Sequence, residues 1–163
     1  MALANSYTDA LEATTILTNT VGSESWLSLA DDLKNASLIQ ATFLLDSSFN
    51  WAGTIASDTQ ELRWPRNNVT DQDGRLIAND AIPNALKTAV AMLAVNLVKS
   101  SGINGVSNNV KSIKVGPIAI GLDSTESVDE QIIPRYIISV LGFLGSYTGP
   151  SDSKSAYNIK AFR

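Results

Sequence analysis

The clearest hydrophobic pattern in the chain is a helical repeat that follows Pro83. Four large apolar residues recur at i, i+4, i+7 and i+11, the spacing of one helix face: Leu86, Val90, Leu93 and Leu97. Pro83 suits the first helical position, where its missing N–H costs no hydrogen bond. Ser100-Ser101-Gly102 ends the pattern. The sequence therefore predicts a helix from Pro83 to about residue 100, and the alanines between its apolar positions keep this helix slim enough for close packing.

A second helical pattern covers about residues 31 to 48. Its face carries four residues at the same spacing: Leu38, Thr42, Leu45 and Phe49. Asp31 and Asp32 near its start suit the positive end of the helix dipole. We expect shorter helices after Ser6, around Ser23 to Ser25, and from Pro134 to about Gly145. Ser6 would cap the first of these, with Asp9 at the spacing of a capping box.

Elsewhere the period changes from helical to alternating. Apolar residues alternate with others from Ile113 to Leu122, on both sides of Gly116-Pro117, which predicts one or two β-strands over about 110–122 with a kink at that dipeptide. Residues 52–82 form a long connection, and we expect apolar side chains to pin it to the core. Asp73-Gly74 indicates a turn within it.

These elements predict a mainly α protein: a bundle of about four helices, a short β-hairpin or strand element, and an extended C-terminal tail. The chain has 163 residues, 44% hydrophobic and 17% charged, which is typical of one globular domain. We assign residues 1–150 to that domain and 151–163 to an arm after Gly149-Pro150.

Composition excludes several kinds of chemistry. The chain has no cysteine and no histidine, so disulfides, thiol catalysis, the usual zinc sites and histidine acid–base catalysis are ruled out. Acidic residues near helix starts are explained by capping. We therefore expect neither an enzyme nor a protein with a cofactor or metal.

The apolar segment 132–144 contains Pro134 and Arg135 and is too short to span a membrane. The first residues lack the pattern of a signal peptide, and the absence of cysteine is typical of a cytosolic product or a part of a virion.

The charge pattern bears on nucleic-acid binding. The net charge is −4, and lysines and arginines are scattered rather than clustered with aromatic residues. Tight binding to nucleic acid by the isolated chain is therefore not expected, because phosphate neutralisation supplies most of that affinity. Lys111 and Lys114 leave two interpretations equally open: contact with phosphate, or protection of an exposed strand edge.

Two short motifs allow a functional and a structural interpretation. Trp64-Pro65-Arg66 could stack a nucleic-acid base. Burial of the tryptophan, with the arginine paired to Glu61 or Asp58, is favoured because no second aromatic platform lies nearby. The segment 71–74 resembles the start of a calcium loop, but the later ligands of such a loop are missing, so a plain turn is favoured.

The order of the motifs resembles a known family. The segments that carry the resemblance, over roughly residues 5 to 145, are Asn5-Ser6-Tyr7, Leu38-Ile39-Gln40-Ala41-Thr42 leading to Leu45-Asp46, Leu62-Arg63-Trp64-Pro65-Arg66, Asp73-Gly74, Ile82-Pro83 and Lys114-Val115-Gly116-Pro117-Ile118. Together they resemble phage proteins often labelled DnaT-like single-stranded-DNA-binding protein. Members of that family are similar, in element order and size, to the head–tail adaptor (connector) proteins under the portal of tailed phages.

This resemblance implies two functions. The first is a structural virion protein, made in the host cytoplasm, that forms a cyclic homo-oligomer of about twelve copies at the head–tail junction. Its partners would be the portal protein, a tail or nozzle protein, and double-stranded DNA passing through the lumen without specific binding. The second is a single-stranded-DNA-binding accessory protein. The acidic balance favours the first, because a mildly acidic lumen repels phosphate.

The polar arm after Gly149-Pro150 is the predicted partner-binding segment. It carries spaced apolar anchors and a terminal cation: Tyr157, Ile159, Phe162 and Arg163. Tyr157 and Ile159 alternate as they would in an added β-strand. We expect the arm to bind the portal or a neighbouring subunit. A frayed terminus without a role is the alternative.

Overall fold

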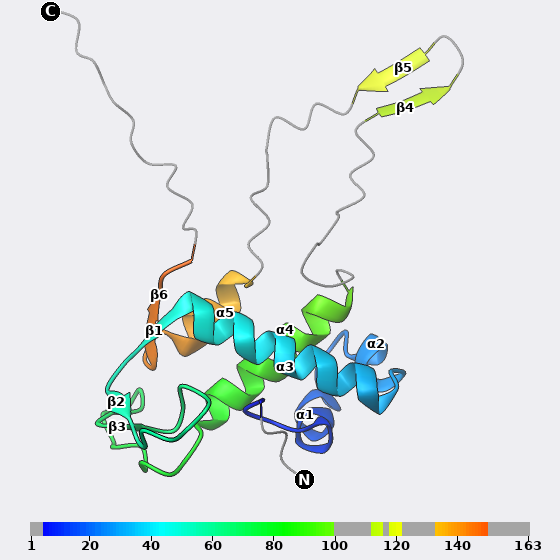
Figure 1. Cartoon of the computed structure of the whole chain (residues 1–163). Coiled ribbons are helices and arrows are strands. Elements are labelled where there is room, and N and C mark those ends of the chain that lie inside the picture. Colours follow the sequence, from blue (N-terminus) through cyan, green and yellow to red (C-terminus); the bar gives the residue numbers. More distant parts are fainter. Residues whose placement is uncertain (1–4, 100–111, 116–117, 122–132, 150–163) are drawn as a thin grey trace, which may run out of the picture.

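The computed structural model describes residues 5–99, 112–115, 118–121 and 133–149 (Figure 1). Its helices are α1 (Ala10–Leu17), α2 (Glu24–Leu27), α3 (Asp31–Ser48), α4 (Asn84–Lys99) and α5 (Arg135–Leu141). Its strands are β1 (Phe49–Trp51), β2 (Thr54–Ile55), β3 (Arg66–Asn67), β4 (Ser112–Val115), β5 (Ile118–Gly121) and β6 (Gly145–Tyr147). The mainly α prediction with short β elements is confirmed.

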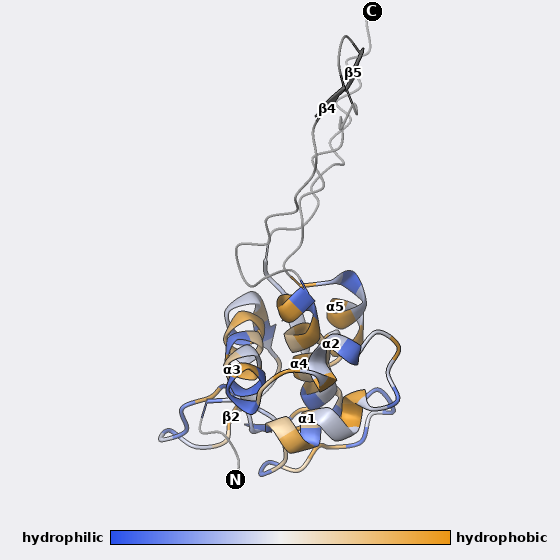
Figure 2. Ribbon diagram, turned by 90° about the vertical axis from the view of Figure 1, so that its right-hand side faces the viewer, coloured by the Kyte–Doolittle hydropathy of each residue, from blue (hydrophilic) through white to orange (hydrophobic). Residues whose placement is uncertain are grey.

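Helix α4 is the centre of the molecule. It contacts α1, α2, α3 and α5, and Figure 2 shows it between α3 and α5. Its buried residues lie on more than one face: Leu86, Ala89, Val90, Ala91, Leu93, Ala94, Val95 and Leu97. Alanines on several sides let the neighbouring helices approach closely, as expected. Pro83 lies one residue before the helix, and its carbonyl accepts hydrogen bonds from the Leu86 and Lys87 amides.

Helix α3 packs along α4 with one face. That face buries Leu38, Ala41, Thr42 and Leu45, as the periodicity predicted, and the helix has the predicted bounds. Phe49, assigned to the same helical face, instead begins β1 and is buried there. The residue still reaches the core, because the chain extends directly from the last turn of α3 into the strand.

The first and last helices differ from prediction. Asp9, not Ser6, caps α1: its side chain accepts the Glu12 amide at 2.9 Å. Ser6 is buried, and its hydroxyl accepts a hydrogen bond from Thr42. Helix α5 ends at Leu141 rather than near Gly145, because residues 145–147 form β6 and pair with β1. The register of this antiparallel pair joins Phe49 to Tyr147 and Trp51 to Gly145.

Two further strand pairs are antiparallel. β4 and β5 form the predicted hairpin, with Ser112 opposite Gly121 and Val115 opposite Ile118. Gly116 and Pro117, which join them, lie outside the described residues. β2 and β3 close the start of the long connection 52–82, with Thr54 opposite Asn67. This connection is therefore tied back on itself near its beginning rather than left without structure.

Candidate functional site

The Trp64-Pro65-Arg66 motif is internal. Trp64 is 2% exposed, and its ring meets the ring of Trp51 edge to face at 6.0 Å. Phe49 stacks on the other side of this cluster, 4.9 Å from Trp51. The Trp64–Pro65 peptide bond is cis. No face of Trp64 is available to stack a base, so the structural interpretation of this tryptophan is confirmed.

Arg66 is buried against backbone. Its guanidinium donates to four carbonyl oxygens: Ala52 at 2.6 Å, Gly53 at 2.8 Å, Arg63 at 3.1 Å and Trp51 at 3.4 Å. The predicted pairing with Glu61 or Asp58 is wrong. The planar fork of arginine suits this role, since its five N–H donors can satisfy several carbonyls in different directions. Arg66 therefore binds the turn after β1 to the segment before β3.

Gly53 lets the backbone before β2 approach the backbone of β3 closely. Its φ is +69°, a conformation that side chains disfavour, and a Cβ atom there would overlap the carbonyl oxygen of Asn67. The position therefore needs glycine both for its backbone angle and for the close approach of β2 and β3.

Asp46 is the polar centre of the same region. Its carboxylate accepts hydrogen bonds from the Tyr7 hydroxyl at 2.7 Å, Trp51 Nε1 at 2.9 Å and the Arg63 amide at 3.4 Å. Burial raises the pKa of Asp46, while these donors act in the opposite direction. Burial and the neighbouring Asp46 raise the pKa of Tyr7. Asp46 thus joins the N-terminal segment, α3 and the long connection, a role that sequence reasoning missed.

The turn at residues 71–74 is confirmed. Asp71 accepts the amides of Asp73 and Arg75, each at 2.9 Å, and Arg75 also forms ion pairs with both carboxylates. The backbone hydrogen bond from Arg75 lowers the pKa of Asp71. Gly74 has the positive φ, +79°, that the turn requires. No group of acidic residues that could hold a metal occurs in the described part of the chain.

The outer face of α3 is apolar and uncovered by the described residues. It carries Leu33, Ile39 and Phe43, which are 57%, 36% and 67% exposed. A groove of about 460 Å³ lies beside it, lined by Asn5, Ile39, Thr42, Phe43, Asp46, Ser47, Glu61, Leu62 and Arg63. Phe43 and Arg63 thus share one groove with the carboxylates of Asp46 and Glu61. We call Leu33, Ile39 and Phe43 the outer face of α3.

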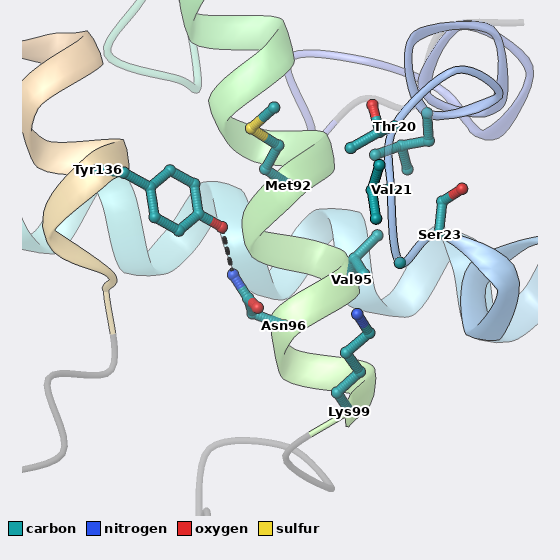
Figure 3. A pocket seen from close by; sticks show the side chains of 10 residues that line it. Thr20, Val21, Ser23, Met92, Val95, Asn96, Lys99 and Tyr136 are labelled. Atoms are coloured by element: carbon teal, nitrogen blue, oxygen red, sulfur yellow. Dashed lines mark hydrogen bonds between the residues drawn. The ribbon is translucent and has the colours of Figure 1, made fainter.

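A smaller pocket lies on the other side of α4 (Figure 3). Its volume is about 260 Å³, and its walls come from the turn between α1 and α2, from α4 and from Tyr136 of α5. Asn96 donates a hydrogen bond to the Tyr136 hydroxyl at 2.7 Å. Lys99 is the only charged residue in this lining. The lining therefore offers no acid–base pair for catalysis.

Several basic side chains pair with carboxylates of the same chain, and most large aromatic side chains are buried. Lys87 pairs with Glu12 at 2.7 Å, Lys34 with Asp31, and Arg75 with the turn at 71–74. All three tryptophans are buried. Among the described residues, the aromatic side chains that are half or more exposed, Phe43 and Tyr136, lie on different helices. The described surface therefore lacks the row of stacking rings and cations typical of a single-strand groove.

Comparison with known families identifies the chain more directly. A family model described as "Putative DnaT-like ssDNA binding protein" matches residues 1–163, the whole sequence. The chain belongs to this family. No curated protein and no solved structure matches it. The family description names single-stranded DNA, and it gives no support to an adaptor role.

Of the predicted site residues, the structure brings one group together. Trp64, Pro65 and Arg66 form the buried cluster beside β1, whereas Asp73 and Gly74 belong to the separate turn and Pro83 precedes α4. Gly116, Pro117, Lys111 and the four arm residues Tyr157, Ile159, Phe162 and Arg163 lie outside the described residues. No helix among the residues searched is both long and apolar enough to cross a membrane.

Proposed function

We propose that the chain is a non-enzymatic structural protein of the virion, a head-to-tail adaptor that forms a ring between the portal and the tail. The observation that carries the proposal is the burial of Trp64 and Arg66. The motif best suited by composition to hold nucleic acid instead stabilises the fold. Among the exposed residues of α3 are three large apolar side chains, Leu33, Ile39 and Phe43, of a kind typical of protein contacts.

Charge supports the same proposal. A net charge of −4 opposes strong attraction to phosphate, and a ring that lets double-stranded DNA slide through its lumen needs little attraction. In this proposal the copies form a cyclic homo-oligomer, about twelve by resemblance to portal rings. The arm 151–163 then contacts the portal or a neighbouring copy.

A single-stranded-DNA-binding accessory protein is the second candidate. The family description supports this candidate better than it supports an adaptor. One structural observation also favours it: Phe43 and Arg63 line the same groove, so a base could stack on the ring while the guanidinium meets a phosphate. Asp46 and Glu61 in that groove weaken the attraction to phosphate.

Loss of the protein from a phage that encodes it separates the two candidates. An adaptor is needed after packaging, so its loss should leave DNA replication normal and produce DNA-filled heads without tails. An accessory factor for single strands should instead reduce DNA synthesis before heads are filled. Electron microscopy of the particles and measurement of intracellular phage DNA give both results. Reduced synthesis, or virions of normal form without this protein, would overturn the adaptor proposal.

A further inference from the structure

Among the described helices, α3 carries the most exposed large apolar side chains, which make up its outer face. Ile39 and Phe43 lie on the side of α3 opposite its buried residues, and Leu33 lies to one side of them near the start of the helix. Such a face is costly in water, since each exposed apolar side chain forgoes the free energy of burial. We propose that the C-terminal arm of the same chain, residues 150–163, binds along this face and its groove before the protein meets its partners.

The path of the chain supports this occupant. β6 pairs with β1, and the Thr148 amide donates to the Ser48 carbonyl at 2.8 Å. Ser48 is the last residue of α3. The chain therefore leaves the described core beside the C-terminal end of the helix whose outer face is uncovered. Phe43 lies only about one turn from this exit.

The arm is also long enough. Helix α3 has 18 residues and, at about 1.5 Å per residue, is about 27 Å long. The 14 residues from 150 to 163, if extended at about 3.3 Å each, span about 46 Å. The arm leaves the core beside Ser48, the last residue of α3, and is therefore long enough to reach every residue of the outer face. Its short tether gives it a high effective concentration there, which favours binding within one molecule over binding between copies.

The chemistry of the two surfaces is complementary. The arm holds three apolar anchors, Tyr157, Ile159 and Phe162, and the outer face holds three apolar side chains. The arm carries three basic residues and one acidic residue. The groove contains Asp46 and Glu61, and α3 begins with the exposed Asp31 and Asp32. An arm running back along α3 brings its terminal cations toward these acidic groups.

In this inference the arm covers the outer face of α3 in the free protein and leaves it on assembly. The same anchors cannot bind α3 and an external partner at once. A partner that takes the arm therefore exposes the outer face, and a partner that takes the outer face releases the arm. The inference concerns the isolated chain and does not depend on the adaptor proposal.

Paramagnetic relaxation in the full-length protein tests this inference. The chain has no native cysteine, so Ser155→Cys gives a single site for a nitroxide label. We expect amide signals on the outer face of α3, such as those of Ile39 and Phe43, to broaden, while those near Leu11 on α1 do not. Leu11 is also an exposed apolar residue, 79% exposed, and serves as the internal control.

A mixed sample and two variants complete the test. We then mix ¹⁵N protein that carries no spin label with spin-labelled protein at natural isotope abundance. No broadening of α3 signals is expected, because the contact lies within one chain. Phe43→Ser should reduce the broadening in the labelled chain, whereas the matched Leu11→Ser should leave it unchanged. Absence of broadening on α3, broadening on another surface alone, or equal broadening in the mixed sample would each overturn the inference.

Discussion

Two regions of the molecule use their residues in opposite ways. The cluster around Trp64 and Arg66 contains aromatic and basic groups that would attract attention in a nucleic-acid-binding protein, and Trp51, Trp64 and Arg66 are all buried. The outer face of α3 contains ordinary apolar residues, and they are directed outward. The comparison teaches that residue type alone does not locate a binding surface. A side chain can bind a partner only where the fold leaves it exposed.

The largest expected effect on stability comes from substitution of Arg66. In Arg66→Lys, one ammonium with three donors replaces a fork that reaches four carbonyls, so buried acceptors lose their partners. We expect a loss of about 3 kcal/mol in the free energy of unfolding. Urea denaturation followed by tryptophan fluorescence measures it. A loss near zero would show that the guanidinium is dispensable and that Arg66 is free for another role.

Asp46→Asn should have a smaller effect, about 1 kcal/mol, because the amide can keep part of the hydrogen bonding with Tyr7 and Trp51. Its pH dependence is specific. Burial raises the pKa of Asp46 above 3.8, so the folded state binds this proton more tightly than the unfolded state. Between pH 3.8 and the raised pKa of Asp46, the free energy of unfolding of the wild type therefore falls relative to that of the variant as the pH rises. The deficit of Asp46→Asn should shrink as the pH rises.

Asp71→Asn provides the matched control, with the opposite sign. The hydrogen bond from the Arg75 amide lowers the pKa of Asp71, so its contribution to stability is present above the ordinary pKa and is lost as the pH falls. The deficit of this variant should grow as the pH rises. Equal slopes for the two variants in thermal or urea denaturation would contradict the opposite pKa shifts, raised by burial at Asp46 and lowered by backbone hydrogen bonding at Asp71.

Phe43→Ser should have the smallest effect on stability. The side chain is 67% exposed and lies on the side of α3 away from α4, so we expect a change within about 0.5 kcal/mol. Leu11→Ser on α1 should behave alike. If Phe43→Ser were strongly destabilising even in a chain that ends at residue 149, the core itself would cover the outer face, and the contrast with the Trp64 cluster would weaken.

Periodicity predicted the elements whose apolar residues contact a nearby helix. It placed α3 and the body of α4, because Leu38, Leu45, Leu86 and Leu93 repeat with the helical period over many turns. Alternation from Ile113 to Leu122 likewise predicted one or two strands there, and the structure shows two, β4 and β5, which are neighbours in sequence.

The errors arose where distant segments decide the outcome. Helix α5 stops early because residues 145–147 pair with β1, nearly a hundred residues away. Asp46 is a polar centre only because Tyr7 and Trp51 approach it from different segments. Arg66 was expected to bind a carboxylate, but backbone carbonyls of the turn after β1 surround it. No local pattern reports such contacts.

Fluorescence anisotropy with a labelled single-stranded oligonucleotide, repeated at several salt concentrations, tests the central claim most directly. The claim is that the buried cluster of Trp51, Trp64 and Arg66 stabilises the fold and that the chain does not hold single-stranded DNA. The account predicts no salt-sensitive binding at micromolar protein. Sub-micromolar binding that weakens steeply with salt and is abolished by Phe43→Ser together with Arg63→Ser, while Leu11→Ser leaves it intact, would contradict the account and identify the α3 groove as a single-strand site.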